Sequence, residues 1–368
     1  MSIEKYQTAK GTRYRVRMTL PGGKRTDKRG FTSKREAQLY LADYQVQRSR
    51  GSFVPESAGR LQMSALLRQT LESDIHRAPT TRATREAHAR KWLLPYWGSW
   101  SVGEITTLDV RDWVRSMLDA GAKRDTIMKS HQLLKSVLDS AIERRFISVN
   151  PMPALQLPKE QKKLHQYLTH DEVRELVDET PPHYRELVAV LAYTGIRFGE
   201  AAALEPRSLD LARQRLHVVR SVSEPNGKLS YGPPKNGKKR SVPLPRKLIA
   251  MLERRLATIA PDGHVFTTSA GNVIRLSTWR RRVFQATIRQ LNVRREHEGR
   301  PPFPEITPHD LRHTAASLAV QAGANVKVVQ RMLGHSSAAI TLDVYADLFD
   351  TDLDDVASRL DAVIRLGD

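Results

Sequence analysis

The first 50 residues alternate polar and apolar positions in a pattern that predicts a small sheet followed by one helix. Residues 14–18 have the period of two that is typical of a half-buried strand. After a Pro-Gly-Gly turn, residues 24–31 can return as the paired strand. Ser33 and Glu36 have the spacing of a capping box, which opens a helix that runs to about Arg48.

Residues 60 to about 148 repeat their apolar positions with the 3.6-residue period of helices. The predicted helices cover residues 61–75, 81–94, 107–120 and 123–145, and prolines or glycines mark the breaks between them. Four of the five tryptophans lie in this stretch: Trp92, Trp97, Trp100 and Trp113. We interpret them as the core of a helical bundle rather than as side chains that stack on bases.

Two stretches without either period are predicted linkers, at residues 51–55 and 150–163. Prolines prevent a helix in the second linker, and its charged end has nothing to bury. From Leu168 onward helices dominate, interrupted by a strand pattern between Arg215 and Leu244. The predicted fold class is therefore α+β and mainly helical. It comprises a small sheet-and-helix domain at residues 1–55, a helical domain at 60–155, and a mostly helical domain with a small sheet at 164–368.

The chain is strongly basic, which indicates a polyanionic partner. There are 60 lysines and arginines against 40 aspartates and glutamates, which gives a net charge of +20. The excess is uneven, because residues 1–50 hold 13 basic and 4 acidic residues while residues 341–368 hold 8 acidic and 2 basic ones. A short basic sheet backed by a helix suits DNA, and the acidic end is expected to avoid phosphates.

The composition excludes several classes of protein. The chain has no cysteine, which excludes disulfide frameworks, thiolate zinc sites and cysteine nucleophiles and suits a reducing cytosol. The first residues lack the apolar stretch of a signal peptide, and no run approaches the roughly 18 apolar residues of a membrane span. We therefore expect a cytoplasmic protein without a membrane partner.

Two stretches carry cations suited to phosphate. Gly195 is expected to end a helix, and Arg197 and Glu200 lie three apart on one face of the next helix. The carboxylate can hold the guanidinium for bidentate phosphate binding, although a purely structural ion pair has the same spacing. The Asn-Gly pair after Lys235 is a hairpin turn signal that places this lysine at a tip. From there it can donate a proton to a leaving oxygen, or only contact phosphate.

A third stretch reads Thr-Pro-His-Asp-Leu-Arg-His. Thr307 is predicted to cap a helix that begins at the next residue, with Asp310 completing a capping box. The helix start then presents His309 and Arg312, one turn apart, at a positive dipole end that favours phosphate. His309 and His313 also have the spacing of a zinc helix, but the neighbouring arginine would repel a metal, which favours the phosphate interpretation.

A fourth stretch is Leu-Gly-His, which ends at His335 and is followed ten residues later by Tyr345. Either residue alone would be assigned to packing or to an ordinary hydrogen bond. The order of these elements, however, strongly resembles that of the tyrosine recombinase family, especially phage-type integrases: an arginine, a lysine, His-x-x-Arg, Leu-Gly-His and then a tyrosine. The resemblance covers the chain from about residue 60 and, less specifically, from residue 1.

The resemblance implies a catalytic set without cofactor or metal: Arg197, Lys235, His309, Arg312, His335 and Tyr345. Two arginines and the histidines would stabilise charge on the phosphate while the tyrosine attacks it. The implied product is a 3′-phosphotyrosyl intermediate, which can be rejoined to another strand without ATP or metal. His309 is the expected general base or a phosphate ligand. Lys235, with Lys238 and Lys239 as neighbours, is the expected general acid.

The resemblance also implies domain roles and partners. Residues 1–55 would be an arm-type DNA-binding domain, residues 60–155 a core-binding domain and residues 164–368 the catalytic domain. An apolar stripe after Tyr345 predicts a C-terminal helix, which either docks on a neighbouring protomer or packs as an ordinary core helix. The implied partners are double-stranded DNA attachment sites, a homotetramer on DNA, a host DNA-bending protein and a directionality factor, in the cytoplasm of a bacterial host.

Three other functions use parts of the same pattern. A relative without catalysis would be a DNA-binding regulator, against which the intact set of six residues argues. A type IB topoisomerase would share the chemistry but let each strand reseal on itself, and a metal-dependent nuclease would be sensitive to a chelator. The expected function is therefore a site-specific DNA recombinase that integrates and excises a phage or mobile element.

Overall fold

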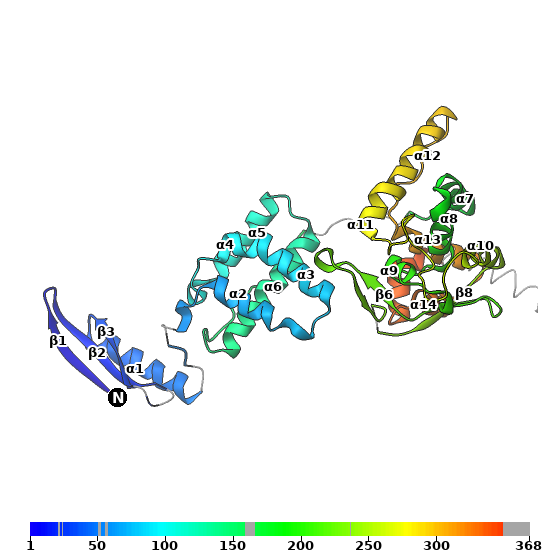
Figure 1. Cartoon of the computed structure of the whole chain (residues 1–368). Coiled ribbons are helices and arrows are strands. Elements are labelled where there is room, and N and C mark those ends of the chain that lie inside the picture. Colours follow the sequence, from blue (N-terminus) through cyan, green and yellow to red (C-terminus); the bar gives the residue numbers. More distant parts are fainter. Residues whose placement is uncertain are drawn as a thin grey trace, which may run out of the picture. The chain divides into compact units, whose positions relative to one another are not determined.

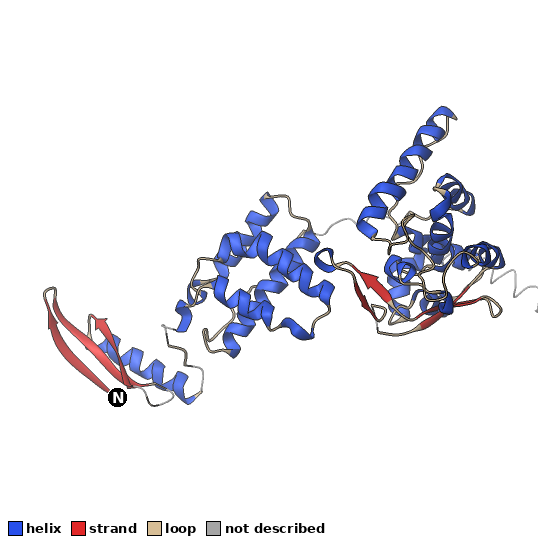
Figure 2. Cartoon of the chain, in the orientation of Figure 1, coloured by secondary structure: helices blue, strands red, loops and turns tan. Residues whose placement is uncertain are grey.

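The computed structural model describes residues 1–20, 23, 25–50, 53–55, 58–158, 166–235 and 237–348. The chain divides into two compact units, Met1–Glu160 and Gln161–Asp368. Helices dominate, and the strands form small antiparallel sheets (Figure 1, Figure 2). The predicted class, α+β and mainly helical, is confirmed. In the described part of the chain no helix is both long and apolar enough to cross a bilayer.

The first 50 residues form a three-stranded antiparallel sheet with one helix packed against it (Figure 1). The elements are β1 (Ser2–Thr8), β2 (Gly11–Thr19), β3 (Arg25–Phe31) and α1 (Lys34–Ser49). Val16 and Phe31 of the sheet pack with Tyr44 of the helix in one small core. The apolar pattern does not predict β1, because this edge strand is mostly polar and is held by backbone pairing to β2.

The helical part of the first unit matches the predicted periodicity closely. Its helices are α2 (Met63–Glu72), α3 (Pro79–His88), α4 (Leu94–Trp97), α5 (Thr107–Asp119) and α6 (Arg124–Glu143). A π-helical turn joins α3 to α4, and Pro95 then occupies the first turn of α4, where its missing N–H is tolerated. Trp97 and Trp113 are fully buried in the core of the bundle, with ring centroids 5.9 Å apart, and the partly buried Trp92 and Trp100 pack against that core.

The second unit carries the remaining elements. Its helices are α7 (His170–Glu179), α8 (Arg185–Thr194), α9 (Phe198–Ala202), α10 (Arg246–Leu256), α11 (Leu276–Trp279), α12 (Gln285–His297), α13 (Asp310–Gln321), α14 (Val326–Leu333) and α15 (Ala338–Tyr345). Its strands are β4 (Leu209–Asp210), β5 (Arg215–Val218), β6 (Ser221–Ser223), β7 (Ser230–Gly232) and β8 (Arg240–Pro243). Helix α8 is buried over most of its surface, which explains why its sequence is apolar almost all round.

Lys235 does not lie at the tip of a paired hairpin, which corrects the sequence prediction. Strand β7 pairs with β6, whereas β8 pairs with β5, so the strands on either side of this lysine belong to different sheets. Two prolines at 233–234 precede it, and because proline has no N–H the β7 ladder ends at Gly232. Lys235 instead lies in a turn, in which the Gly237 N–H donates to the Pro234 carbonyl.

The helix predicted to begin directly after Thr307 begins later, at Asp310. Residues 308–309 form a turn, and His309 is the N-cap residue. The predicted contact between Thr307 and Asp310 is nevertheless present, because the N–H and the hydroxyl of Thr307 both donate to the Asp310 carboxylate, each at 2.7 Å. The polar contact therefore fixes the turn that carries His309 rather than a first helical turn.

Both predicted linkers lie partly outside the described residues, and the predicted C-terminal helix lies outside them as well. Residues 151–158 have no regular secondary structure, as the second predicted linker requires, and the end of that linker lies outside the described part. The predicted C-terminal docking helix lies within residues 349–368, also outside it.

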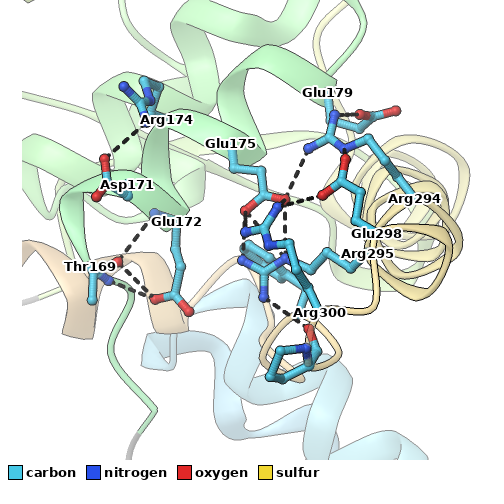
Figure 3. A network of polar contacts seen from close by, with 12 residues as sticks. Thr169, Asp171, Glu172, Arg174, Glu175, Glu179, Arg294, Arg295, Glu298 and Arg300 are labelled. Atoms are coloured by element: carbon cyan, nitrogen blue, oxygen red, sulfur yellow. Dashed lines mark hydrogen bonds and ion pairs between the residues drawn. The ribbon is translucent and has the colours of Figure 1, made fainter.

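One carboxylate anchors the long helix α12, which extends away from its unit in Figure 1. Glu175 of α7 accepts hydrogen bonds from the guanidinium groups of Arg294, Arg295 and Arg300, as Figure 3 shows. The hydrogen bonds from Arg295, followed by those from the other two arginines, lower the pKa of Glu175 to about 2. The network therefore ties α7 to α12 and to the start of the loop that leads back to His309.

We expect Glu175→Gln to lower the free energy of unfolding at pH 7 and to lose this effect in acid. The folded pKa of about 2 lies below the ordinary value of 4.5, so the carboxylate contributes stability above pH 4.5 that is lost as the pH falls towards 2. Urea unfolding of both proteins at several pH values measures the difference. Asp171→Asn on the same helix, whose ion pair with Arg174 is exposed, is the matched control and should change little. A difference that does not depend on pH would contradict the prediction.

Candidate active site

Five of the six predicted residues meet in one cluster around the start of α13. Arg197 and Tyr345 lie close enough to Arg312 to shift its pKa. Arg312 and Arg197 in turn lie close enough to His335 to shift the pKa of that histidine. Besides burial, the charges of Arg312 and Arg197 also act on His309 and lower its pKa. The sixth residue, Lys235, is exposed in its turn. Segments more than a hundred residues apart in the chain thus supply one site.

Arg312 is the buried centre of the cluster. Its guanidinium, on a side chain 4% exposed overall, donates to the carbonyl oxygens of Gly195 at 2.7 Å and Leu333 at 2.6 Å. Gly195 ends α8 as predicted, with a left-handed φ of 64°. A Cβ atom here would lie 2.6 Å from Cδ2 of Leu333, which could move aside, so it is mainly the left-handed φ that favours glycine at this position.

Glu200 is the carboxylate of the cluster, and it holds two arginines. The predicted pair with Arg197 is present, with Nη1 at 3.2 Å from Oε1, but Arg197 is the N-cap of α9 rather than a residue on its face. Glu200 also accepts the main-chain N–H of Arg197 at 2.8 Å. The second guanidinium belongs to Arg240 of β8, whose Nη1 and Nη2 bind the two carboxylate oxygens at 2.9 and 2.6 Å.

Arg240 belongs to none of the motifs that point to the site, although the strand pattern around it carries a signal. Arg240 and Val242 alternate with exposed residues along β8, so the strand period of two places both on the inner face. The Arg240 side chain is 8% exposed, and its Nε donates to the carbonyl oxygen of Met332 at 3.0 Å. It passes so close to Gly334 that a Cβ there would lie 2.8 Å from its Cδ. Arg240 therefore links Glu200 to the turn that carries His335.

The cluster contains the guanidinium groups of Arg197, Arg240 and Arg312. The carboxylate of Glu200 binds the first two of them. Burial would raise the pKa of Glu200, but hydrogen bonds and charge from Arg240, with smaller effects from Arg197, hold that pKa below its ordinary value. Burial, reinforced by the charges of Arg197 and Arg240, lowers the pKa of Arg312 to about 9, which still leaves it positive at neutral pH. The site therefore carries excess positive charge on partly buried groups, beside which an anion such as phosphate is strongly favoured.

The histidines of the cluster are kept neutral. Burial first, and then the charges of Arg312, Arg197 and Arg240, lower the pKa of His335 to about 4. Burial, reinforced by the charge of Arg312, also lowers the pKa of His309, and Lys235 contributes to this shift. Lys235 is thus close enough to act on the site electrostatically. Neutral histidines can donate an N–H to phosphate and can also accept a proton.

Tyr345 is the last residue of α15 and is 1% exposed. Its ring stacks on His335, with centroids 6.4 Å apart and an interplanar angle of 8°. Its hydroxyl lies 2.8 Å from Nδ1 of His313. Burial raises the pKa of Tyr345 to about 12. His313 is the second residue that the sequence analysis does not assign to catalysis; its position one helical turn after His309 is the signal that could have indicated it.

The zinc interpretation of His309 and His313 finds no third ligand among the described residues. The two rings pack edge to face, with centroids 5.2 Å apart, and Nδ1 of His313 faces the tyrosine hydroxyl. Within the described ranges, no group of three or more histidine, aspartate or glutamate side chains is placed to hold a metal ion.

Comparison with known proteins identifies the family. Residues 166–352 match the phage integrase family. The integrase of Mycobacterium phage D29 is 30% identical over 271 residues, which cover 71% of this chain and 68% of that protein. The chain belongs to the phage integrase family. The tyrosine recombinase XerC of Mycobacterium sp. (strain KMS) is 28% identical over 250 residues, or 65% of this chain and 78% of that protein. This integrase-family chain is thus a tyrosine-type site-specific recombinase, as the sequence predicts.

Solved structures show the same fold. The integrase of transposon Tn1549, in complex with a circular intermediate DNA, aligns with a TM-score of 0.70 and 20% identity over 82% of this chain and 100% of that chain. A lambda integrase tetramer bound to a Holliday junction aligns with a TM-score of 0.57 and 17% identity over 91% of this chain and 96% of that chain. Both of these integrases are bound to DNA.

Proposed function

We propose that this integrase-family recombinase cuts and rejoins DNA through a 3′-phosphotyrosyl bond to Tyr345. The observation that carries the proposal is the excess positive charge of three clustered guanidinium groups beside a buried tyrosine hydroxyl. Such groups stabilise the charge that develops on a phosphodiester as it is attacked, without a metal ion. The phosphotyrosyl bond preserves the energy of the broken linkage, so rejoining needs no ATP.

Each predicted residue has a role in this proposal. Arg197, Arg312 and His335 bind the phosphate oxygens, and His309 lies beside them as a further phosphate ligand. Lys235 supplies the proton to the departing 5′ oxygen from its exposed turn, where movement towards bound DNA is unobstructed by strand pairing. Lys238 and Lys239 are exposed in the same loop and are the alternatives for this proton.

The remaining domains would hold the DNA. Residues 1–55 act as an arm-type DNA-binding domain, residues 60–155 as a core-binding domain and residues 164–368 as the catalytic domain. The partners are double-stranded attachment sites, further copies of the chain in a tetramer, a host DNA-bending protein and a directionality factor. The lambda integrase tetramer on a Holliday junction supports the DNA and the tetramer in this proposal, and the matched mycobacteriophage integrase supports integration. The reaction would take place in the cytoplasm of a bacterial host and would integrate and excise a phage or mobile element.

A covalent-trapping assay tests the proposal. The protein is incubated in excess EDTA with DNA that flanks its own gene, nicked so that the cleaved strand diffuses away before it can be rejoined. We expect a protein–DNA species that survives denaturation and whose DNA-linked peptide contains Tyr345. Tight, salt-sensitive binding without an adduct would favour the regulator, and relaxation of supercoiled DNA that lacks a recognition site would favour a type IB topoisomerase.

A further inference from the structure

The hydroxyl of Tyr345 is shielded from bulk water. The side chain is 1% exposed and belongs to an apolar cluster with Ala316, Val329 and Leu333. Burial raises its pKa to about 12, so the phenol keeps its proton at neutral pH. A protonated phenol is a poor nucleophile, and at neutral pH hydroxide is too dilute to ionise more than a trace of a phenol with this pKa. A group inside the protein must therefore accept the proton.

His313 and His335 contact Tyr345, and His309 packs against His313, so geometry separates the three histidines. His335 presents the face of its ring to Tyr345, and its Nδ1 lies 3.0 Å from the hydroxyl of Thr341. His309 packs edge to face against His313, with ring centroids 5.2 Å apart. His313 alone of the three has a nitrogen, Nδ1, at 2.8 Å from the tyrosine oxygen among the contacts of the described residues. This distance is within the reach required of a general base.

We propose that His313 is the general base that accepts the proton of Tyr345 when the tyrosine attacks the DNA. The inference rests on the proposed role of Tyr345 as nucleophile and adds a catalytic residue to the six predicted ones. Because the phenol holds its proton at rest, its O–H donates to Nδ1, which places the ring proton of a neutral His313 on Nε2. His309 is thereby left to bind phosphate.

The proton and electron balance of the step is complete. The O–H bond of Tyr345 breaks, its proton moves to Nδ1 of His313, and the oxygen forms a bond to phosphorus. The bond from phosphorus to the 5′ oxygen breaks, and that oxygen takes a proton from Lys235. On rejoining, the 5′ hydroxyl attacks phosphorus and gives its proton back to the neutral amine of Lys235, while the imidazolium of His313 returns its proton to the departing tyrosine oxygen.

The groups that face this pair are compatible with proton transfer. His309 faces His313 from the turn before α13, and Arg312, one residue away on α13, favours the ionised form of Tyr345. Tyr167 opposes ionisation of Tyr345 from the segment before α7. His335 is held neutral by burial and by the neighbouring arginines, so it does not compete as a charged donor.

The test compares His313→Asn with His309→Asn, one helical turn apart, by the pH dependence of single-turnover cleavage. The DNA carries sulfur in place of the scissile 5′ oxygen, because a thiolate leaves without protonation and the titration of Lys235 drops out. We expect His313→Asn to cleave about 10²-fold more slowly at pH 7. Its rate should then rise about tenfold per pH unit up to pH 9, because only the tyrosinate fraction reacts. His309→Asn should be slower but keep the pH profile of the wild type.

A chemical rescue separates loss of the base from structural damage. Incorporation of 3,5-difluorotyrosine at position 345, a more acidic phenol, should restore at least about tenfold of the rate of His313→Asn at pH 7. An unchanged pH profile in His313→Asn, no rescue by the acidic phenol, or a changed profile in His309→Asn alone would each overturn the assignment. If the wild type itself forms no adduct, the proposed function is contradicted. If the wild type forms the adduct normally and one of these three results is obtained, only the assignment of His313 as general base is contradicted.

Discussion

The Tyr345→Phe protein is expected to bind its DNA as the wild type does and to form no covalent adduct. The substitution removes a single oxygen atom, and the phenyl ring can still fill the apolar cluster and stack on His335. Cleavage should therefore fall by about 10⁴-fold or more, because the nucleophile itself is lost. The measurements are denaturing electrophoresis with the nicked substrate in EDTA and a binding titration with the intact site.

A matched control keeps this result specific. Tyr193 also lies in the second unit, with its hydroxyl 3.5 Å from Nδ1 of His170, and Tyr193→Phe should leave the yield of adduct unchanged. Tyr345→Phe leaves His313 Nδ1 without the phenol, which should cost about 1–3 kcal/mol of stability. An adduct of normal yield from Tyr345→Phe would show that another residue is the nucleophile.

The periodicity of the sequence predicts the helices well and the sheets less well. Regular spacing of apolar residues locates α2, α5 and α6 because each buries one face in the tryptophan core. Strand β1 is missed because an edge strand needs backbone partners more than apolar side chains. The pairing around Lys235 is mispredicted for a related reason: a turn signal does not specify which strand a chain pairs with, and two prolines end the ladder early.

The candidate site, like the fold, is only partly predictable from the sequence. Residues that belong to a recognisable motif are predicted, and Arg197, His309, Arg312, His335 and Tyr345 do come together. Arg240 and His313 are not assigned, because their importance depends on contacts across the chain: Arg240 with Glu200, 40 residues away, and His313 with Tyr345, 32 residues away. Sequence spacing constrains neighbours on one helix or strand, whereas such contacts arise only when separate elements pack.

The second large effect is expected at the pair formed by Glu200 and Arg240. Their side chains are 1% and 8% exposed, so replacing Glu200 with methionine leaves the Arg240 charge buried without its partner. Removing one member of a buried pair costs about 3–5 kcal/mol, and a domain of this size should lose about 10 °C in Tm. Arg240→Met should be comparably unstable, since it leaves the carboxylate with Arg197 alone. Thermal unfolding monitored by circular dichroism provides the measurement.

The double variant Glu200→Met, Arg240→Met separates the stability of the pair from its role in the site. Two packed apolar side chains should recover most of the stability lost in either single variant, because neither charge of this pair is left buried without the other. Cleavage should nevertheless stay at least about 10²-fold below the wild type, because Glu200 no longer holds Arg197 and Arg240 no longer supports the turn before His335. A stable double variant with wild-type cleavage would show that the pair contributes only to folding. A double variant as unstable as the sum of the single variants would show that the two side chains are not energetically coupled.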